Sequence, residues 1–333
     1  PSDTIVMSSW QQIGDYLFAE AQLEANKRVA SRLLKREVSS LEPIGFGRNS
    51  RVYKVIAADS HAYTLKMYFR HVSDKRDRLE TEFSALSFLW QNGVRNIPRP
   101  IAVDRIGSCA LYEYIDGQKI DTEKVTDAQI DGAISFLRLL EKLKECDGSA
   151  EFAPASEACF SVRAIVENIH QRLNRFSDRS NSKACYTDLH EFLDSQLVPS
   201  LEKIVTWCQA KLEGSHLSFI REIDLSQRTL SSSDFGFHNA LRRGNGELVF
   251  LDFEYFGWDD PAKMVVDVLL HPGMNLPEGA KRRFVQGMIH GFCNYPTLEK
   301  RIEVVYPLFG IKWCLILLNE FLPEQLVRRT FAG

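Results

Sequence analysis

The stretch "SSSDFGFHNALRRGNGELVFLDFEYFGWDDP", residues 231–261, contains the most informative cluster of polar residues in this chain. It places Asp234 five residues before Asn239, and a glycine-containing turn separates both from Asp252. The dipeptide Asn245–Gly246 lies between two strand-like runs and predicts a two-residue hairpin turn, because both turn positions favour positive φ. A two-residue turn sets a register in which Asn239 faces Asp252 directly.

This register predicts a cation site. Directly opposed residues have β-carbons about 5 Å apart, so the amide oxygen of Asn239 and the carboxylate of Asp252 can share one ion. Mg²⁺ takes a few such protein oxygens and completes its shell with phosphate oxygens and water. Asp234 lies just upstream, where a carboxylate can accept the proton of an attacking hydroxyl. Taken alone, the spacing of Asp234 and Asn239 would also fit a turn residue followed by the first residue of a strand. The coincidence of this spacing with the hairpin and with "LDFE" favours the cation site.

The first third of the chain predicts a small antiparallel sheet. An amphipathic helical pattern over residues 10–35 precedes three β-rich runs within residues 38–69. A second helical pattern over residues 74–91 is followed by two more strand-like runs, which end at Asp116–Gly117. The lobe is therefore expected to have the order βββ-α-ββ.

The rest of the chain is predicted to be mainly helical, apart from the hairpin. At 333 residues the chain is long enough for two lobes, each with its own core. The expected division is a helical extension at 1–37, a first lobe at 38–116, and a second lobe at 117–333 with a helical insertion at about 126–213.

Two features of the first lobe point to a phosphate ligand. The turn "GFGRNS" contains Gly45 and Gly47, which let backbone approach a phosphate without β-carbon obstruction, although most such turns are only turns. Lys66 lies inside the apolar run "YTLKMYF", where a cation needs a partner or a ligand, unless it is an exposed edge-strand lysine. Glu82 on the following helix is the expected partner, and Glu80 is the competing choice.

Composition limits the classes of partner. The net charge is -3, from 41 basic and 44 acidic residues mixed along the chain, so we expect neither nucleic acid nor an anionic membrane as partner. The seven cysteines form no CxxC pair and indicate reduced thiols in a cytoplasmic protein. The apolar run "WCLILLNEFL" is shorter than the roughly 20 residues of a membrane span, and no secretion signal is evident. Oligomeric state is left open.

Together these motifs resemble the aminoglycoside phosphotransferase and choline kinase-like family of small-molecule kinases. The resemblance runs from about Leu41 to His271, with "GFGRNSRVYKV" as phosphate loop, "LYEYIDG" as hinge, "SDFGFHN" as catalytic loop and "FLDFEYFGWDDP" as metal segment. It implies an α+β, protein-kinase-like bilobal fold, with a five-stranded antiparallel N-lobe plus helix and a larger, mainly helical C-lobe.

The resemblance also implies an activity: nucleotide- and Mg²⁺-dependent phosphorylation of a hydroxyl on a small molecule, such as a sugar, an aminoglycoside-like compound or an amino-alcohol. Asp234 would be the catalytic base, Asn239 and Asp252 the Mg²⁺ ligands, and Lys66 the contact to the α- and β-phosphates, paired with Glu82. The further nucleotide-binding residues would be Gly45, Gly47, Asn49, Ser50, Tyr112, Glu113 and Ile115.

In the implied hinge, the carbonyl of Glu113 and the amide of Ile115 would receive the nucleotide base. Tyr112 would be the gatekeeper, or a core aromatic, or both. ATP is the expected phosphoryl donor. GTP stays open as the donor, because a bulky gatekeeper favours guanine over adenine in some relatives.

Several positions near the catalytic loop qualify the resemblance. Ser232 stands where the family often has histidine, which keeps open a nucleotide-binding pseudokinase that acts as an interaction module. Only eight residues separate Asp252 from Pro261, too few for the peptide platform of a protein kinase. Asp260 is expected to cap a helix whose first residue is Pro261. Asp267 is expected to be structural, and Glu254 either assists the metal or ends a strand in solvent.

The acceptor site is the least defined part of the expectation. The insertion is locally basic, with Arg163, Arg172, Arg175 and Arg179. This charge suits an acceptor with a phosphate, a carboxylate or plain sugar hydroxyls better than a polycationic aminoglycoside. The alternative is that these arginines form a solvated basic helix face. Candidate acceptor contacts are Trp258, Asn319 and Glu320. The alternatives are a core tryptophan and two helix-surface residues.

Overall fold

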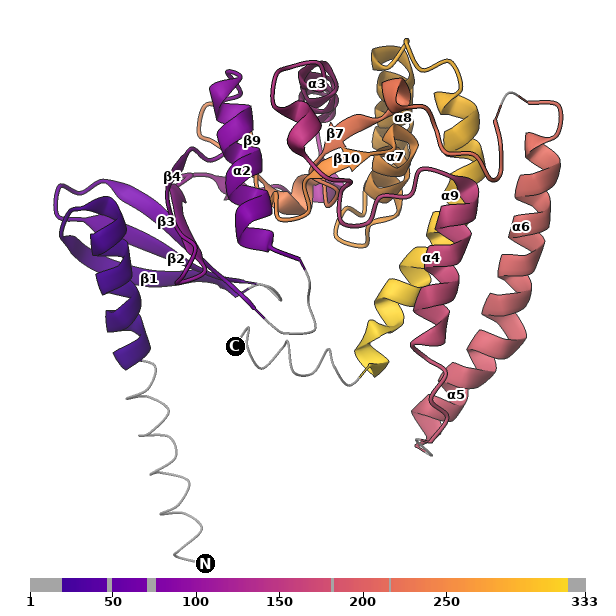
Figure 1. The fold of residues 1–333 in the computed structure, drawn as a ribbon, viewed down its shortest axis with the longest axis horizontal. Coiled ribbons are helices and arrows are strands. Elements are labelled where there is room, and N and C mark those ends of the chain that lie inside the picture. The colour runs from indigo at the N-terminus through magenta and orange to yellow at the C-terminus, as the bar shows by residue number, and fades with distance from the viewer. Residues whose placement is uncertain (1–19, 47–49, 71–75, 181–182, 216, 323–333) are drawn as a thin grey trace, which may run out of the picture.

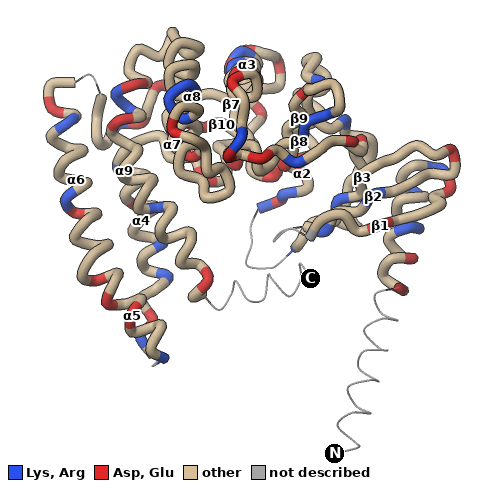
Figure 2. Tube along the Cα trace, turned by 180° about the vertical axis from the view of Figure 1, so that it is seen from behind, with Lys and Arg blue, Asp and Glu red and all other residues tan. Residues whose placement is uncertain are grey.

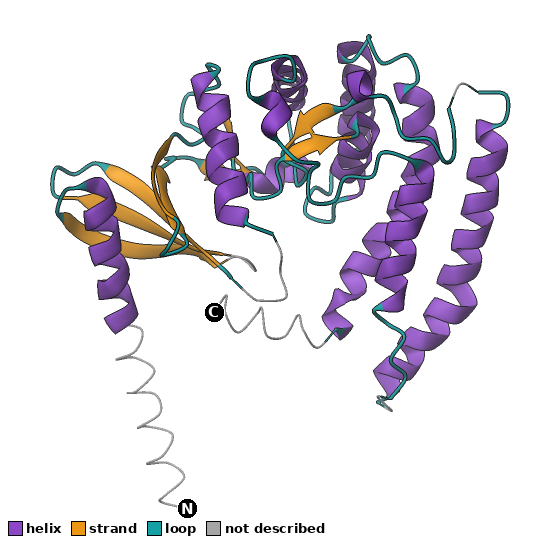
Figure 3. Cartoon of the chain, in the orientation of Figure 1, coloured by secondary structure: helices purple, strands orange, loops and turns teal. Residues whose placement is uncertain are grey.

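The computed structural model describes residues 20–46, 50–70, 76–180, 183–215 and 217–322. One β-sheet lies at one end of the molecule and most of the helices lie at the other (Figures 1 and 3). The sheet is antiparallel throughout, in the order β1-β2-β3-β5-β4. It contains the five strands that the sequence predicted: β1 (Val38–Phe46), β2 (Ser50–Ala57), β3 (Ala62–Tyr68), β4 (Pro100–Asp104) and β5 (Cys109–Glu113).

Each face of this sheet is covered by one helix. The leading helix, described over residues 20–34, packs its Ala30 on a cluster that includes Val55 and Leu65. The part of its predicted span before residue 20 lies outside the described residues. Helix α2 (Arg78–Gln91) covers the other face. Because successive side chains of a strand alternate between faces, Lys66 points to the α2 side, opposite to Leu65.

The second part of the chain is a helical assembly, as predicted. Helix α9 packs on α7, α4 and α6, and its Val304, Val305 and Leu308 are fully buried. Figure 2 shows basic and acidic residues mixed over the tube. The helices are α3 (Asp127–Leu143), α4 (Val162–Asn174), α5 (Ala184–Phe192), α6 (Val198–Leu212), α7 (Pro261–Leu270), α8 (Glu278–Gly291) and α9 (Leu298–Leu317).

The C-terminal apolar run is longer than the sequence analysis expected. Residues Leu298–Phe321 form one stretch of 24 residues, in which an 18-residue window has a mean hydropathy of 1.5 and is 39% buried; by length and composition alone, the stretch could cross a membrane. No other helix in the described ranges meets that criterion. Its fully buried side chains and its packing on three neighbouring helices are typical of a core helix in a globular lobe.

Short strands that the sequence analysis missed frame the opening stretch. The remainder was expected to be helical apart from the hairpin, yet two further small sheets form there: β7 (Thr229–Ser231) with β10 (Gly257–Asp259), and β6 (Gln118–Lys119) with the hairpin strands β8 (Ala240–Arg242) and β9 (Leu248–Phe250). Runs of two or three residues are too short for a period of two to be recognised. Strand β7 ends three residues before Asp234, so it fixes the start of the predicted catalytic loop.

The hairpin forms, but its predicted two-residue turn is wrong. The amide of Arg243 donates to the carbonyl of Glu247 at 2.9 Å, so three residues, 244–246, make the loop. Within that loop only Gly246 has positive φ, at 88°. This is a type I turn closed by a left-handed glycine, a common three-residue hairpin connection. Gly244, which precedes the Asn-Gly pair, supplies the additional loop residue.

The longer loop shifts the register by one residue. Ala240 pairs with Phe250, and the amide of Leu251 donates to the carbonyl of Asn239 at 2.8 Å. The residue opposite Asn239 is therefore Leu251, and the predicted direct pairing with Asp252 is wrong. Asp252 instead lies just beyond β9 with φ of 62°, so the alternation of a strand does not set the direction of its side chain.

Candidate active site

A buried lysine joins the two lobes. The ammonium of Lys66 lies 2.7 Å from Glu82 Oε2 on α2 and 2.8 Å from Asp252 Oδ1. Burial alone would lower the pKa of Lys66, but the charges of Asp252 and Glu82 raise it well above its usual value. Lys66 is therefore a fixed cation. Glu80, the competing partner, pairs with Arg105 instead.

A chain of phenols connects this lysine pair to the predicted hinge. The hydroxyl of Tyr68 donates to Glu82 Oε2 at 2.7 Å, and the hydroxyl of Tyr112 lies 2.7 Å from that of Tyr68. Burial, together with the charge of Glu82, raises the pKa of both phenols well above the usual range, so both stay neutral. Tyr112 is thus a buried core aromatic whose hydroxyl is already engaged.

The other predicted nucleotide contacts lie at both ends of the sheet, because Ser50 pairs with Tyr68 at the end of β3 and Glu113 pairs with Tyr63 near its start. Gly45 is in β1, Ser50 opens β2 and is buried, and Ile115 follows β5. The carboxylate of Glu113 accepts a hydrogen bond of 2.8 Å from Arg243 in the hairpin. Two further predicted contacts, Gly47 and Asn49, lie outside the described residues.

The loop that carries Asp234 is held in a tight conformation. Ser233 has φ of 65°, a left-handed conformation that costs a non-glycine residue on the order of 1 kcal/mol or more. Two hydrogen bonds fix the loop. The amide of Ser233 donates to Ser231 Oγ at 2.9 Å, and the amide of Asp234 donates to the carbonyl of Ser232 at 2.8 Å. The ammonium of Lys263, from α7, adds a contact of 3.1 Å to Ser233 Oγ.

One histidine contacts Asp234 within hydrogen-bond distance, and a second histidine stacks on the first. His238 Nε2 lies 3.1 Å and His271 Nε2 lies 3.7 Å from Asp234 Oδ1, and the two rings stack with centroids 3.8 Å apart. His271 Nδ1 accepts the amide hydrogen of Gly273, so in the neutral ring the proton is on Nε2 and points to Asp234. Burial lowers the pKa of His271 to about 4, which keeps that ring neutral.

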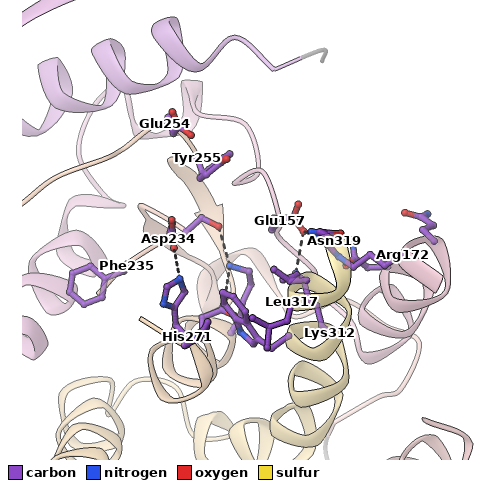
Figure 4. A pocket seen from close by; sticks show the side chains of 18 of the residues that line it. Glu157, Arg172, Asp234, Phe235, Glu254, Tyr255, His271, Lys312, Leu317 and Asn319 are labelled. Carbon is purple, nitrogen blue, oxygen red and sulfur yellow. Dashed lines mark hydrogen bonds and ion pairs between the residues drawn. The ribbon is translucent and has the colours of Figure 1, made fainter. Parts of the chain in front are cut away.

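These contacts set the protonation state of Asp234. Burial raises the pKa of this carboxyl, but the hydrogen bond from His238 and the nearby His271 outweigh that effect and leave the pKa below its usual value. Asp234 is therefore an anion, with Oδ1 held by imidazole. Since Oδ2 is not needed for these contacts, it is the oxygen available to a ligand in the cavity (Figure 4).

The donor set beside Lys66 suits a hard cation. Carboxylate oxygens of Glu82, Asp252 and Glu254 lie within 4.8 Å of one another. The side-chain amide of Asn239 donates to the carbonyl of Asp234 at 2.9 Å, which directs its nitrogen away and leaves its oxygen as a potential ligand. Burial and the charge of Asp252 raise the pKa of Glu254 to about 7. Such crowded acidic oxygens fit Mg²⁺.

A cavity of about 960 Å³ opens in front of Asp234 (Figure 4). Its walls come from the catalytic loop, α4, α7 and α9 and from the residues around Asp252. Of the predicted acceptor contacts, Asn319 and Glu320 line it. Trp258 does not: its indole donates to the carbonyl of Ser149 at 3.2 Å, in keeping with the packing alternative.

Two aspartates of α7 behave as expected from the sequence. The side chain of Asp260 accepts the amide hydrogen of Ala262 and caps a helix that begins at Pro261. Asp267 accepts the indole hydrogen of Trp313 at 3.0 Å and pairs with Lys263 at 3.1 Å, so its contacts are structural.

Sequence reasoning missed several residues of this site. His238 directly precedes Asn239, and this position in the loop was the signal that could have identified it. The others come from segments that carry no motif: Glu157, Lys263, His271 and Lys312.

The chain is similar to phosphotransferases of known structure and matches one family model. A family model described as "Phosphotransferase enzyme family" matches residues 40–303. No curated protein sequence matches. Among solved structures, a spectinomycin phosphotransferase in complex with ADP and spectinomycin is similar at a TM-score of 0.59 and 15% identity, over 93% of each chain.

Two further solved structures are kinases of small amino-alcohols. An ethanolamine kinase of Plasmodium vivax has a TM-score of 0.58 and 17% identity, over 89% of this chain and 83% of the kinase. A choline kinase of Cryptosporidium parvum Iowa II has a TM-score of 0.58 and 13% identity, over 88% and 87%. At these identities the similarity establishes the fold, and it confirms the predicted α+β, protein-kinase-like architecture.

Proposed function

Because the chain belongs to the phosphotransferase enzyme family, we propose that it transfers the terminal phosphoryl group of ATP, or of GTP, to a hydroxyl of a small molecule with the help of Mg²⁺. The observation that carries this proposal is the position of Asp234. It is an anionic carboxylate with one oxygen in contact with His238 and near His271, and with the other oxygen available to the cavity. The fixed cation Lys66 and the acidic oxygens around Asp252 complete the set of groups that such a transfer needs.

The donor would bind through groups that now contact one another. Its phosphates would replace Asp252 at the ammonium of Lys66, while Glu82 keeps that ammonium in place. Asp252 is then free to hold Mg²⁺ together with the amide oxygen of Asn239. Mg²⁺ supplies neutralisation of the charge on the transferred phosphoryl group.

The acceptor would react in the cavity. As its hydroxyl oxygen attacks the terminal phosphorus, Asp234 Oδ2 accepts the hydroxyl proton, the new P–O bond forms, and the bond to the leaving nucleoside diphosphate breaks. His238 and His271 orient the carboxylate, a supporting role that histidine two residues before the aspartate often has in the family and that Ser232 cannot fill. Catalysis would rest on positioning and on electrostatic stabilisation.

The test compares Asp234→Asn with a surface control, Asp188→Asn on α5. Phosphoryl transfer to a panel of sugars and amino-alcohols and binding of Mg-nucleotide are measured separately. Asp234→Asn should lower kcat by roughly 10²- to 10⁴-fold, the usual contribution of a general base, and should leave the nucleotide Kd within about threefold. Asp188→Asn should change neither. Near-full turnover by Asp234→Asn would refute the assignment.

The same experiment addresses the pseudokinase alternative. If Mg-nucleotide binds tightly, Asp252→Ala weakens that binding, and neither water nor any acceptor receives the phosphoryl group, then the interaction module becomes the better account of this chain.

A further inference from the structure

The acceptor end of the cavity contains two cations that share one carboxylate oxygen. Arg172 Nη2 lies 2.7 Å and Lys312 Nζ lies 3.2 Å from Glu157 Oε2. Burial raises the pKa of Glu157, but the charges of Lys312 and Arg172 outweigh it and bring that pKa to about 2. Glu157 is therefore an anion at any physiological pH, and this charge cluster of Glu157, Arg172 and Lys312 carries one net positive charge.

This excess charge lies where water does little to screen it. The side chain of Lys312 is 3% exposed and that of Arg172 is 15% exposed. An ammonium has three hydrogens to donate, and among the described residues Glu157 is the one carboxylate that forms an ion pair with Lys312. A buried charge without full compensation is costly, so a site of this kind gains from an added anion.

The positive excess is local to the charge cluster. Elsewhere in the cavity lining the acidic side chains outnumber the basic ones, with Asp234, Asp252, Glu254, Asp267 and Glu320 against Arg76, Arg175 and Lys263. An added anion is therefore favoured at the charge cluster and not along the whole cavity. Figure 4 shows Glu157 and Arg172 on the side of the view away from Asp234, so the charge cluster lies apart from the catalytic carboxylate.

The wall beside the charge cluster suits hydroxyl groups. Asn168, Gln171 and Asn319 line the same cavity and offer amide donors and acceptors. Trp313 presents an indole whose orientation is fixed by its hydrogen bond to Asp267. An apolar ring face with amides around it is a setting in which a hydroxylated carbon skeleton can bind.

We infer that the acceptor is a hydroxylated small molecule that carries an oxyanion group, a carboxylate or a phosphate, and that this group docks on Lys312 and Arg172 while a hydroxyl of the same molecule reaches Asp234. The inference rests on the proposed function, because it names the acceptor class of that site. It disfavours an acceptor whose ammonium group would lie against the charge cluster, since that group would meet the local excess of positive charge.

The test uses matched compounds that differ only in their ionic group. One set is glucuronate, glucose 6-phosphate, glucose and glucosamine, and the other is glycerate, glycerol 3-phosphate, glycerol and serinol. Kd is measured by calorimetry and kcat/KM by phosphoryl transfer. In at least one set the carboxylate or the phosphate member should bind at least about tenfold more tightly than the neutral member, the range of a charge-assisted hydrogen bond, and the amine should bind most weakly.

Three variants attribute any preference to the charge cluster. Lys312→Met keeps the wall apolar and leaves Glu157 paired with Arg172, so it should reduce the anion preference to within about threefold. Glu157→Gln should increase anion affinity several-fold, a gain that misfolding cannot imitate. Arg163→Gln, an exposed position on α4 outside the cavity lining, is the matched control and should change nothing.

The outcomes separate the two proposals. Tightest binding of an amine, absence of any Lys312-dependent anion binding, or a preference that neither Lys312→Met nor Glu157→Gln changes would overturn the inference. If amines are phosphorylated with dependence on Asp234, the proposed function stands and the inference fails. If anions bind in the predicted order but no compound is ever phosphorylated, the binding preference stands and the proposed function fails.

Discussion

Lys263 should be one of the most costly residues to replace. It is 1% exposed on α7, and its ammonium lies 2.8 Å from Asp259, 3.1 Å from Asp267 and 3.1 Å from Ser233 Oγ. In Lys263→Met, Asp259 would remain fully buried without a counter-cation. Removal of one partner of a buried ion pair costs about 3–5 kcal/mol, and we expect a loss of that size in the free energy of unfolding.

The loss should depend on pH in a defined direction. Burial already raises the pKa of Asp259, and without Lys263 that pKa rises further. When the pKa of Asp259 is higher in the folded state than in the unfolded state, the folded variant binds a proton that the unfolded chain has already lost. The stability of the variant therefore falls as pH rises from the unfolded pKa to the folded pKa. The free energy of unfolding that Lys263→Met loses, relative to the unaltered protein, should therefore be smaller at pH 5 than at pH 8.

Denaturant unfolding at both pH values measures these quantities. Lys263→Met/Asp259→Asn removes the fully buried uncompensated charge and should recover at least half of the loss; Asp267 also loses Lys263 but is 15% exposed and keeps its hydrogen bond from Trp313. Asp259→Asn alone should also be destabilised, because the ammonium then keeps only Asp267. A deficit below about 1 kcal/mol for Lys263→Met, or simple additivity of the two substitutions, would refute the reasoning.

Three further outcomes are expected. Tyr68→Phe leaves the buried hydroxyl of Tyr112 without its acceptor and should cost about 1–3 kcal/mol; Tyr68→Phe/Tyr112→Phe should recover part of this loss in denaturant unfolding. Gly257→Ala places a β-carbon 2.3 Å from a backbone carbonyl and should lower the melting temperature, whereas Gly244→Ala, which meets no atom within 4 Å, should not. The pKa of His271 falls from 6.5 to about 4 on folding, so stability should decline by roughly 2–3 kcal/mol as pH drops from 6.5 to 4, and His271→Gln should flatten that decline.

The N-lobe could be predicted because its signals are local. Alternation of apolar residues in β2 and β3, the turns between them and the apolar stripe of α2 all lie within short windows of sequence. The contact between Lys66 and Glu82 followed from the same logic, because a cation inside an apolar strand needs an acid on the next element to pack against it.

The hairpin register could not be predicted with the same success. Asn245–Gly246 signals a turn, but it does not say whether Gly244 joins the loop. One additional loop residue moved the partner of Asn239 from Asp252 to Leu251. Asp252 still reaches Lys66 from a left-handed backbone conformation. Aspartate enters that conformation more often than most residues, but nothing in the local sequence distinguished Asp252 from the other aspartates of this stretch.

Contacts at long range in sequence were beyond such reasoning. His271 lies 37 residues from Asp234, and Lys312 is far from Glu157 along the chain. His271 follows α7 and meets the catalytic loop, and Lys312 on α9 meets Glu157 in the segment before α4, so each contact depends on how distant elements pack around one cavity. Local patterns carry no information about which turn of a distant helix will face the site.

Helix α9 combines two tasks whose residues occupy different turns. Val304, Val305 and Leu308 anchor the lobe, whereas the cavity is lined by residues of the last turns and of the segment that follows: Lys312, Trp313, Ile316, Leu317, Asn319 and Glu320. Substitutions in the last turns can therefore alter what the cavity accepts while the anchoring turns stay intact. This separation gives the chain a route by which new acceptor preferences can evolve in few steps. It marks the cavity-lining positions within residues 312–320 as those to randomise in a selection for altered specificity, with the fully buried Leu315 kept.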